Sequence, residues 1–144
     1  MINRSSYILI VFITSVLFSS CKKDDPVVDS GIPYVPIEEM INLNNPAYFD
    51  LGVPGGWVYY PAGSRGLIIY RKNQDTFVAM DRHCPYKAAD GCRVDVDNSE
   101  VFSEDDCCGS QFGISDAAIL QGPAVVNLRI YNTTYDGTFL RVFN

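Results

Sequence analysis

The sequence predicts an all-β domain, a sandwich or barrel of antiparallel sheets. Short segments rich in β-branched and aromatic residues alternate with turn residues through most of the chain. Outside the N-terminal segment, no run of about 12 residues shows the apolar periodicity of a helix. The predicted strands are residues 37–43, 56–60, 66–71, 76–80, 100–103, 111–115, 125–131 and 138–143.

Turn residues separate these strands. Pro and Gly lie at residues 53–56 and 61–64, where a fixed φ or a tolerance of positive φ favours a turn. The sequence Tyr-Asp-Gly at residues 135–137 predicts a hairpin between the last two strands. In the final strand Leu140 and Val142 share one face, although the opposite face is not consistently polar. The spacing of the turns is typical of sandwiches and barrels.

The N-terminal segment predicts export. Arg4 precedes a mostly apolar run at residues 7–18, and Ser19 and Ser20 follow it. This order of charge, apolar run and small residues is that of a secretory signal peptide. The run is short for a transmembrane helix, which needs about 20 residues. We therefore expect residues 1–20 to be a signal peptide.

Cys21 directly follows the small residues. The segment resembles a bacterial lipobox, with Phe18 in place of the usual Leu. The resemblance implies that Cys21 is the lipidated first residue of the mature chain, held to a membrane by its acyl chains. An unmodified thiol at Cys21 is the alternative. Residues 22–26, Lys-Lys-Asp-Asp-Pro, resemble the charged tether of Bacteroidetes surface lipoproteins.

These features predict three parts of the chain and a location. Residues 1–20 are the signal peptide, residues 21–32 a lipidated flexible tether and residues 33–144 the folded domain. We expect the protein in the bacterial cell envelope, anchored to the outer membrane on its periplasmic or surface side. The formal net charge of -6 argues against a nucleic acid partner, because phosphate contacts need clustered Lys and Arg.

The cysteines of the expected domain lie in two boxes. The first reads Asp-Arg-His-Cys-Pro-Tyr at residues 81–86, after a predicted strand, and Cys92 follows it. The second reads Asp-Asp-Cys-Cys-Gly-Ser-Gln-Phe at residues 105–112, and Gly-Pro-Ala follows at residues 122–124. Order, spacing and flanking strands resemble the Rieske family from about residue 77 to residue 128. The resemblance implies small antiparallel sheets with two cluster-binding loops at one tip.

The ligand positions implied by this resemblance are mostly changed. A Rieske cluster has two cysteines on one iron and two histidines on the other. An alternative register puts His83 on the first histidine but places Asp81 on a cysteine. The chain holds one histidine, so no register restores the set. In the better register the four positions hold Cys84, Tyr86, Asp105 and Cys108.

The export route also bears on the cysteines. The signal offers Asn3-Arg4 rather than a twin arginine, so we expect the chain to cross unfolded into a compartment where disulfides form. Four cysteines allow three pairings. In disulfide-bearing Rieske branches the extra cysteines of the two loops pair across the tip, which implies a Cys92–Cys107 bridge. A second bridge, Cys84–Cys108, would then replace the cluster.

The sequence thus predicts a cluster-free structural or binding module of the envelope, with no cofactor, whose partners are the membrane and another envelope protein. It identifies no catalytic residue and leaves open whether the protein is an enzyme. One alternative is electron transfer by a [2Fe–2S] cluster on Cys84, Cys108, Asp105 and either Tyr86 or His83. Another is a labile thiol-redox pair, Cys84–Cys108. The last is a zinc site with the donors Cys84, Cys92, Cys107 and Cys108, and His83 in reserve.

Overall fold

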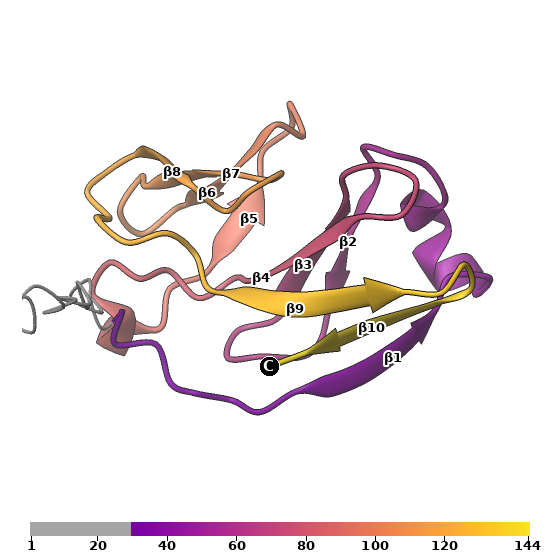
Figure 1. The fold of residues 1–144 in the computed structure, drawn as a ribbon. Coiled ribbons are helices and arrows are strands. Elements are labelled where there is room, and N and C mark those ends of the chain that lie inside the picture. Colours follow the sequence, from indigo (N-terminus) through magenta and orange to yellow (C-terminus); the bar gives the residue numbers. More distant parts are fainter. Residues whose placement is uncertain (1–29) are drawn as a thin grey trace, which may run out of the picture.

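The computed structural model describes residues 30–144, so the expected signal peptide and Cys21 lie outside the described residues. The described part forms a six-stranded and a four-stranded antiparallel sheet, and the smaller sheet stands over one end of the larger (Figure 1). The larger sheet has the order β1-β10-β9-β4-β3-β2 and the smaller sheet the order β5-β6-β7-β8. The strands are β1 (Glu38–Asn42), β2 (Trp57–Tyr60), β3 (Leu67–Arg71), β4 (Phe77–Asp81), β5 (Val94–Val96), β6 (Phe102–Asp105), β7 (Gln111–Gly113), β8 (Ile119–Gln121), β9 (Ile130–Tyr135) and β10 (Phe139–Phe143).

The predicted all-β antiparallel fold is confirmed, with differences in its elements. The expected strand at residues 125–131 begins only at Ile130, where β9 pairs with Met80 of β4. The strands β5 and β8 were not expected, because three residues that include Asp or Gln give no clear alternation. Two 3-10 helices were also not expected, η1 (Pro46–Gly52) and η2 (Ala88–Asp90).

The central strands β3 and β4 are buried on both faces, because the domain has two cores. Leu67, Ile69 and Ala79 face a core inside the larger sheet. Ile68 and Met80 point to the other side, into a core shared with the smaller sheet and the cysteine loops. Strands covered on both faces are expected to be apolar at consecutive positions, as β3 is. The second core therefore anchors the cysteine loops to the rigid centre of the domain.

Arg82 ties the smaller sheet to the larger. It directly follows β4 and is buried. Its Nε donates to the Val94 carbonyl at 2.9 Å, and its guanidinium pairs with Asp95 of β5. The guanidinium carbon also lies 3.8 Å from the ring centroid of Tyr59 in β2. One side chain thus sets where β5 lies against the larger sheet.

The N-terminal end of the described chain packs on the domain. Ile32, which we expected in the flexible tether, is buried. Arg129 donates to the carbonyls of Ile32 and Pro33 at 2.8 and 2.7 Å. The folded unit therefore includes Ile32.

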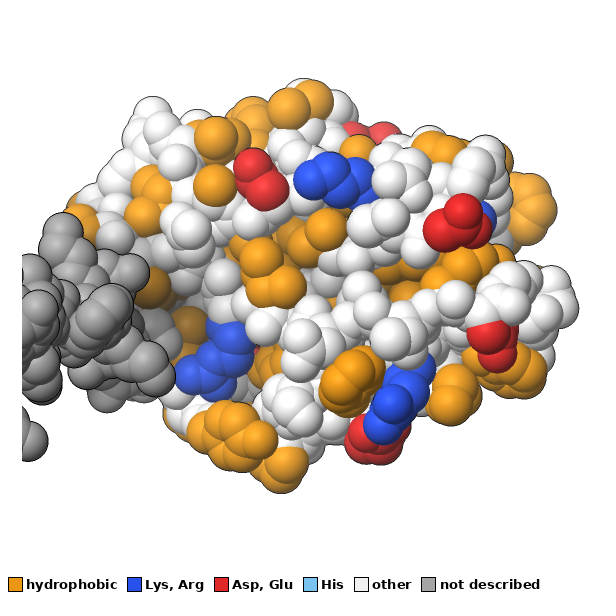
Figure 2. Space-filling view, viewed as in Figure 1, with side chains coloured by type: hydrophobic (Ala, Val, Ile, Leu, Met, Phe, Trp, Pro, Cys, Tyr) orange, Lys and Arg blue, Asp and Glu red, His pale blue; other side chains and the backbone are white. Residues whose placement is uncertain are grey.

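The surface drawn in Figure 2 has its Lys and Arg side chains scattered rather than gathered. Apolar and uncharged side chains separate them, and acidic side chains lie beside some of them. This face of the described residues therefore offers no basic patch. Residues 30–144 contain no helix with the length and apolar character that membrane crossing requires.

Asp81, the last residue of β4, is a fully buried acceptor for several segments. Its Oδ2 accepts from the Ser64 amide at 2.7 Å and from the Tyr131 hydroxyl at 2.8 Å. Its Oδ1 accepts from the amides of His83 at 2.9 Å and Arg65 at 3.2 Å. Burial, and then the bond to Asp81, raises the pKa of the Tyr131 hydroxyl, which therefore stays a donor. This network joins β4, β9 and the β2–β3 turn at the entrance of the first cysteine loop.

We predict that Asp81→Ala lowers the free energy of unfolding by about 3 kcal/mol, because several buried donors lose their acceptor. Urea unfolding followed by the fluorescence of Trp57, the single tryptophan, measures the change. Asp75→Ala, in an exposed turn, is the matched control and should leave the unfolding midpoint nearly unchanged. Equal effects of the two substitutions would refute the role of Asp81.

Candidate functional site

The first cysteine loop leaves β4 and returns to β5. Its base is closed by the Cys84 amide, which donates to the Cys92 carbonyl at 3.0 Å. The loop turns back through Lys87 and Gly91, which both have the left-handed φ that tight turns use (48° and 69°). Cys84 and Cys92 therefore lie opposite each other at the base of the loop.

The second cysteine loop is a tight turn between β6 and β7. Asp105 ends β6 and caps the turn, since its Oδ1 accepts from the Cys107 amide at 2.8 Å. Its carbonyl accepts from the amides of Cys108 at 3.2 Å and Gly109 at 2.6 Å. Gly109 has a φ of +73°, which favours glycine because it has no Cβ. The residue types Asp and Gly in the second box thus build the loop itself.

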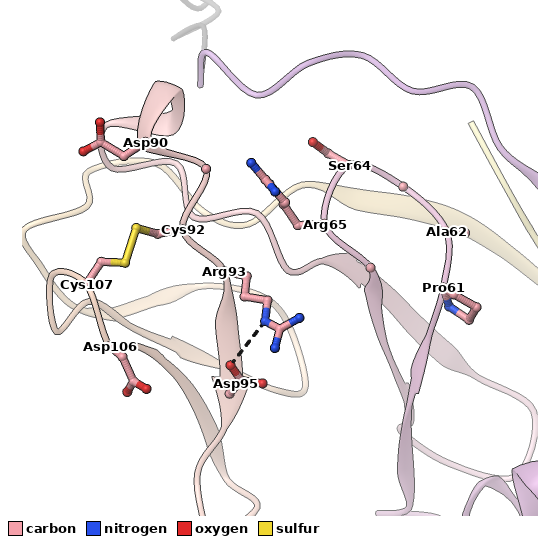
Figure 3. A pocket seen from close by; sticks show the side chains of 13 residues that line it. Pro61, Ala62, Ser64, Arg65, Asp90, Cys92, Arg93, Asp95, Asp106 and Cys107 are labelled. Atoms are coloured by element: carbon pink, nitrogen blue, oxygen red, sulfur yellow. Dashed lines mark ion pairs between the residues drawn. A yellow bond between two sulfur atoms is a disulfide. The ribbon is translucent and has the colours of Figure 1, made fainter.

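A disulfide joins the two loops. Cys92 and Cys107 are bonded, with a distance of 6.3 Å between their Cα atoms (Figure 3). The predicted fold with a disulfide-stapled tip is therefore confirmed at this pair. Closing a loop over a separation of 15 residues stabilises the folded state by about 3 kcal/mol in the chain-entropy model. The bridge holds the loops together without a metal.

An open groove runs beside this disulfide. It has a volume of about 780 Å³ and lies between the β2–β3 turn and the two cysteine loops. Arg93 pairs with Asp95 across 3.8 Å on its floor, and Arg65 approaches from the facing turn (Figure 3). Asp90 and Asp106 line the loop side. The groove therefore presents charges of both signs next to the tip.

Three of the four sequence-predicted ligand positions come together under the tip. The Sγ atoms of Cys84 and Cys108 and a carboxylate oxygen of Asp105 all lie within 4.8 Å of one another. Cys84 and Asp105 are fully buried, and Cys108 is half-buried. Cys84 and Cys108 are 24 positions apart in the chain. The resemblance to the Rieske boxes predicted that they would come together.

The expected Cys84–Cys108 bridge is not formed in the structure, where both residues are free thiols. The physical reason is the position of Asp105. The Cys108 thiol donates to Asp105 Oδ2 at 3.3 Å, and the Cys84 sulfur lies within 4.8 Å of the same carboxylate. The Cys108 S–H group therefore points at the carboxylate rather than at the Cys84 sulfur.

The surroundings of Cys84 favour its protonated form. Burial is the largest cause that raises the pKa of the Cys84 thiol, and the hydrogen bond to Asp105 raises it further. The backbone amide of Tyr86 opposes this shift by donating to the sulfur. A thiol with a raised pKa forms little thiolate at neutral pH, so free Cys84 is a poor nucleophile.

His83, the reserve ligand of the sequence analysis, is not free to bind a metal. It is 3% exposed, and its Nε2 lies 2.8 Å from the Ala88 carbonyl. Because a carbonyl only accepts, Nε2 carries a proton. Nδ1 lies 2.7 Å from the Ser64 hydroxyl. Both ring nitrogens therefore have structural partners, and the ring fastens the first loop to the β2–β3 turn.

The zinc set expected from the sequence is also changed. Cys92 and Cys107 are bonded to each other, so they offer no thiolate, although they lie near Asp105. Of the expected zinc donors, only Cys84 and Cys108 remain as free thiols. Ser110 was not expected at this site, yet its hydroxyl lies 3.0 Å from the Cys108 sulfur. The Gly-Ser pair in the second box is the sequence feature that could have indicated a role for this serine.

The residues present do not fit a Rieske cluster. Such a cluster needs two thiolates on one iron and two imidazoles on the other. In the register that the resemblance implies, Tyr86 stands at one imidazole position, and its half-buried ring packs on the second core with the Lys87 ammonium 5.4 Å from its centroid. The same register puts Cys108 at the other imidazole position and Asp105 at a thiolate position. We therefore derive no chemistry through such a cluster.

Comparison with known proteins places the fold. No protein-family model and no curated protein matches the sequence. Among solved structures, the chain is similar to the cyanobacterial plasma membrane Rieske protein PetC3 from Synechocystis PCC 6803. The match has a TM-score of 0.52 and 18% identity, and covers 77% of this chain and 100% of that chain. The chain therefore has a Rieske-type fold, as the two boxes predicted.

We predict that Cys108 is alkylated by iodoacetamide at pH 8 more than about tenfold faster than Cys84. The reason is that Cys84 is fully buried and its raised pKa limits the thiolate. Peptide mass spectrometry of chelator-dialysed, folded protein measures both rates. The same protein in urea should label both residues at similar rates. Similar rates in the folded protein would contradict this difference.

Proposed function

We propose that this protein is an exported, lipid-anchored module of the bacterial cell envelope that uses the Rieske-type fold for binding or structure rather than for electron transfer. In this proposal the mature chain begins at lipidated Cys21 and contains no [2Fe–2S] cluster. The anchor holds it at the outer membrane, where the folded domain contacts another envelope protein.

The observation that carries the proposal is that the histidine ring is already used by hydrogen bonds within the fold. The chain has a single histidine, and both of its ring nitrogens serve the structure through Ser64 and Ala88. The cluster chemistry of the fold depends on two imidazole ligands, which set the potential of the second iron. The Cys92–Cys107 disulfide and the Asp81 network hold the loops without a cluster. The fold can thus persist without iron.

Apolar side chains beside the second loop support a binding role. Val125 is 85% exposed and Leu120 is 58% exposed. Their neighbours are bonded to that loop, since the Gln121 side chain donates to the Gly109 carbonyl at 3.2 Å and the Ala124 amide donates to the Ser110 hydroxyl at 2.9 Å. Apolar side chains on a rigid support are a common feature of interaction surfaces.

We predict that the full chain, purified in air from an envelope fraction, carries neither stoichiometric iron nor acid-labile sulfide. The physical reason is that no pair of imidazoles is present for the second iron. Iron and sulfide assays, with the visible spectrum, measure the content, and a Rieske protein with its cluster is the positive control. About two irons and two sulfides per chain would overturn the cluster-free proposal.

We predict that Cys21→Ser moves the protein from the detergent phase to the aqueous phase in a detergent-partition assay. Loss of the acyl chains removes about 0.8 kcal/mol of membrane affinity per buried methylene group. The matched control is Asp25→Asn, which lies in the expected tether outside the lipobox and keeps the cysteine. A serine variant that still enters the detergent phase would contradict lipid anchoring at Cys21.

A further inference from the structure

We propose that Cys84, Cys108 and Asp105 form a binding site for one thiophilic divalent cation, for which Zn²⁺ is the probe. The inference deepens the proposed function and rests on its claim that no [2Fe–2S] cluster occupies the loops. The site lies in the place of the cluster, but its three donor atoms converge on one ion rather than on two irons.

The spacing of the donor atoms suits a single ion. All three lie within 4.8 Å of one another, and the Cys108 sulfur lies 3.3 Å from Asp105 Oδ2. Zinc bonds of about 2.3 Å to sulfur and about 2.0 Å to oxygen place tetrahedral ligand atoms about 3.5–3.8 Å apart. The donors therefore need little movement to meet one ion.

The setting of the Asp105 carboxylate also favours a cation. The carboxylate is fully buried, yet among residues 30–144 no ion pair includes it. Its side-chain oxygens accept from the Cys107 amide and from the weakly polar Cys108 S–H group. A bound cation would supply the partner that this buried carboxylate lacks among the described side chains.

Each donor atom is in turn held by a hydrogen-bond donor. The Tyr86 amide donates to the Cys84 sulfur, and the Cys107 amide donates to Asp105 Oδ1. The Ser110 hydroxyl accepts from the Ala124 amide, so its own proton is free for the Cys108 sulfur. Donors aimed at the ligand atoms orient them. The ligand atoms are thus positioned by the fold before any ion binds.

The chemical types of the three ligands favour one class of ion. Two thiolates with one carboxylate favour Zn²⁺ over the hard cations Mg²⁺ and Ca²⁺, which take oxygen ligands. When Zn²⁺ binds, two Zn–S bonds form, two S–H bonds break, and the two protons pass to solvent. Water takes the fourth tetrahedral position, since Cys108 is half-buried and is the most accessible of the three residues.

The test uses the full chain, purified without chelator and with its free thiols counted. The protein is incubated with Zn²⁺, separated from free metal, and assayed for zinc and for affinity by competition with a chromophoric chelator. We expect about one zinc per chain, and Ser110→Ala should weaken binding about tenfold because it removes a bond to a ligand. Asp105→Asn and Cys108→Ser each remove a ligand and should weaken binding further. Asp106→Asn, an exposed neighbouring carboxylate, is the matched control and should bind as the unchanged chain does.

A second readout identifies the ligands. Replacement of Zn²⁺ by Co²⁺ should give a sulfur-to-cobalt absorption band in the near ultraviolet that Asp106→Asn keeps and Cys108→Ser weakens. Stoichiometric iron with sulfide would overturn both this inference and the proposed function. A chain that binds no Zn²⁺, whether with two free thiols or with a Cys84–Cys108 disulfide, would overturn this inference alone.

Discussion

The carboxylate of Asp81 accepts four hydrogen bonds where β4 ends and the first cysteine loop begins. Because these donors come from three separate segments, one buried group positions the β2–β3 turn, β9 and the loop relative to one another. The turn also requires a glycine at Gly63, since a Cβ there would lie 2.7 Å from Asp81 Oδ2 at a φ of +71°. The direction in which Cys84 leaves β4 follows from this packing.

Asp105 does at the second loop what Asp81 does at the first. It also ends a strand, is fully buried, and accepts from an amide two residues ahead. The difference lies in what the remaining oxygen meets. Asp81 meets a hydroxyl and amides, whereas Asp105 meets two thiols. The Asp81 carboxylate is therefore occupied by hydrogen bonds that stabilise the fold. The Asp105 carboxylate instead faces thiols that can lose their protons when a metal binds.

The sequence predicted the parts of this structure that depend on local pattern. Alternation and turn residues placed β3, β4 and β10, and the boxes brought Cys84, Asp105 and Cys108 together. The short polar strand β5 was not predicted, because it is held by pairing with β6 and by contacts from Arg82, which local alternation does not show. The helix at Pro46 was missed although Asn45 is a good capping residue. The Cys84–Cys108 bridge was expected because pairing by position ignores the carboxylate between the sulfurs.

The residues at the expected ligand positions differ from a Rieske set in charge. In the register that the resemblance implies, Cys108 stands at an imidazole position and Asp105 at a thiolate position. With Cys84 they give three donors that are all anionic when they bind a metal, whereas the Rieske set has two anionic and two neutral donors. In the metal-free protein Cys84 and Cys108 are thiols, and the Cys108 S–H donates to Asp105. The disulfide between Cys92 and Cys107 fixes the loops independently of any ion. A loop pair held in this way can keep Cys84, Asp105 and Cys108 together without an ion between them.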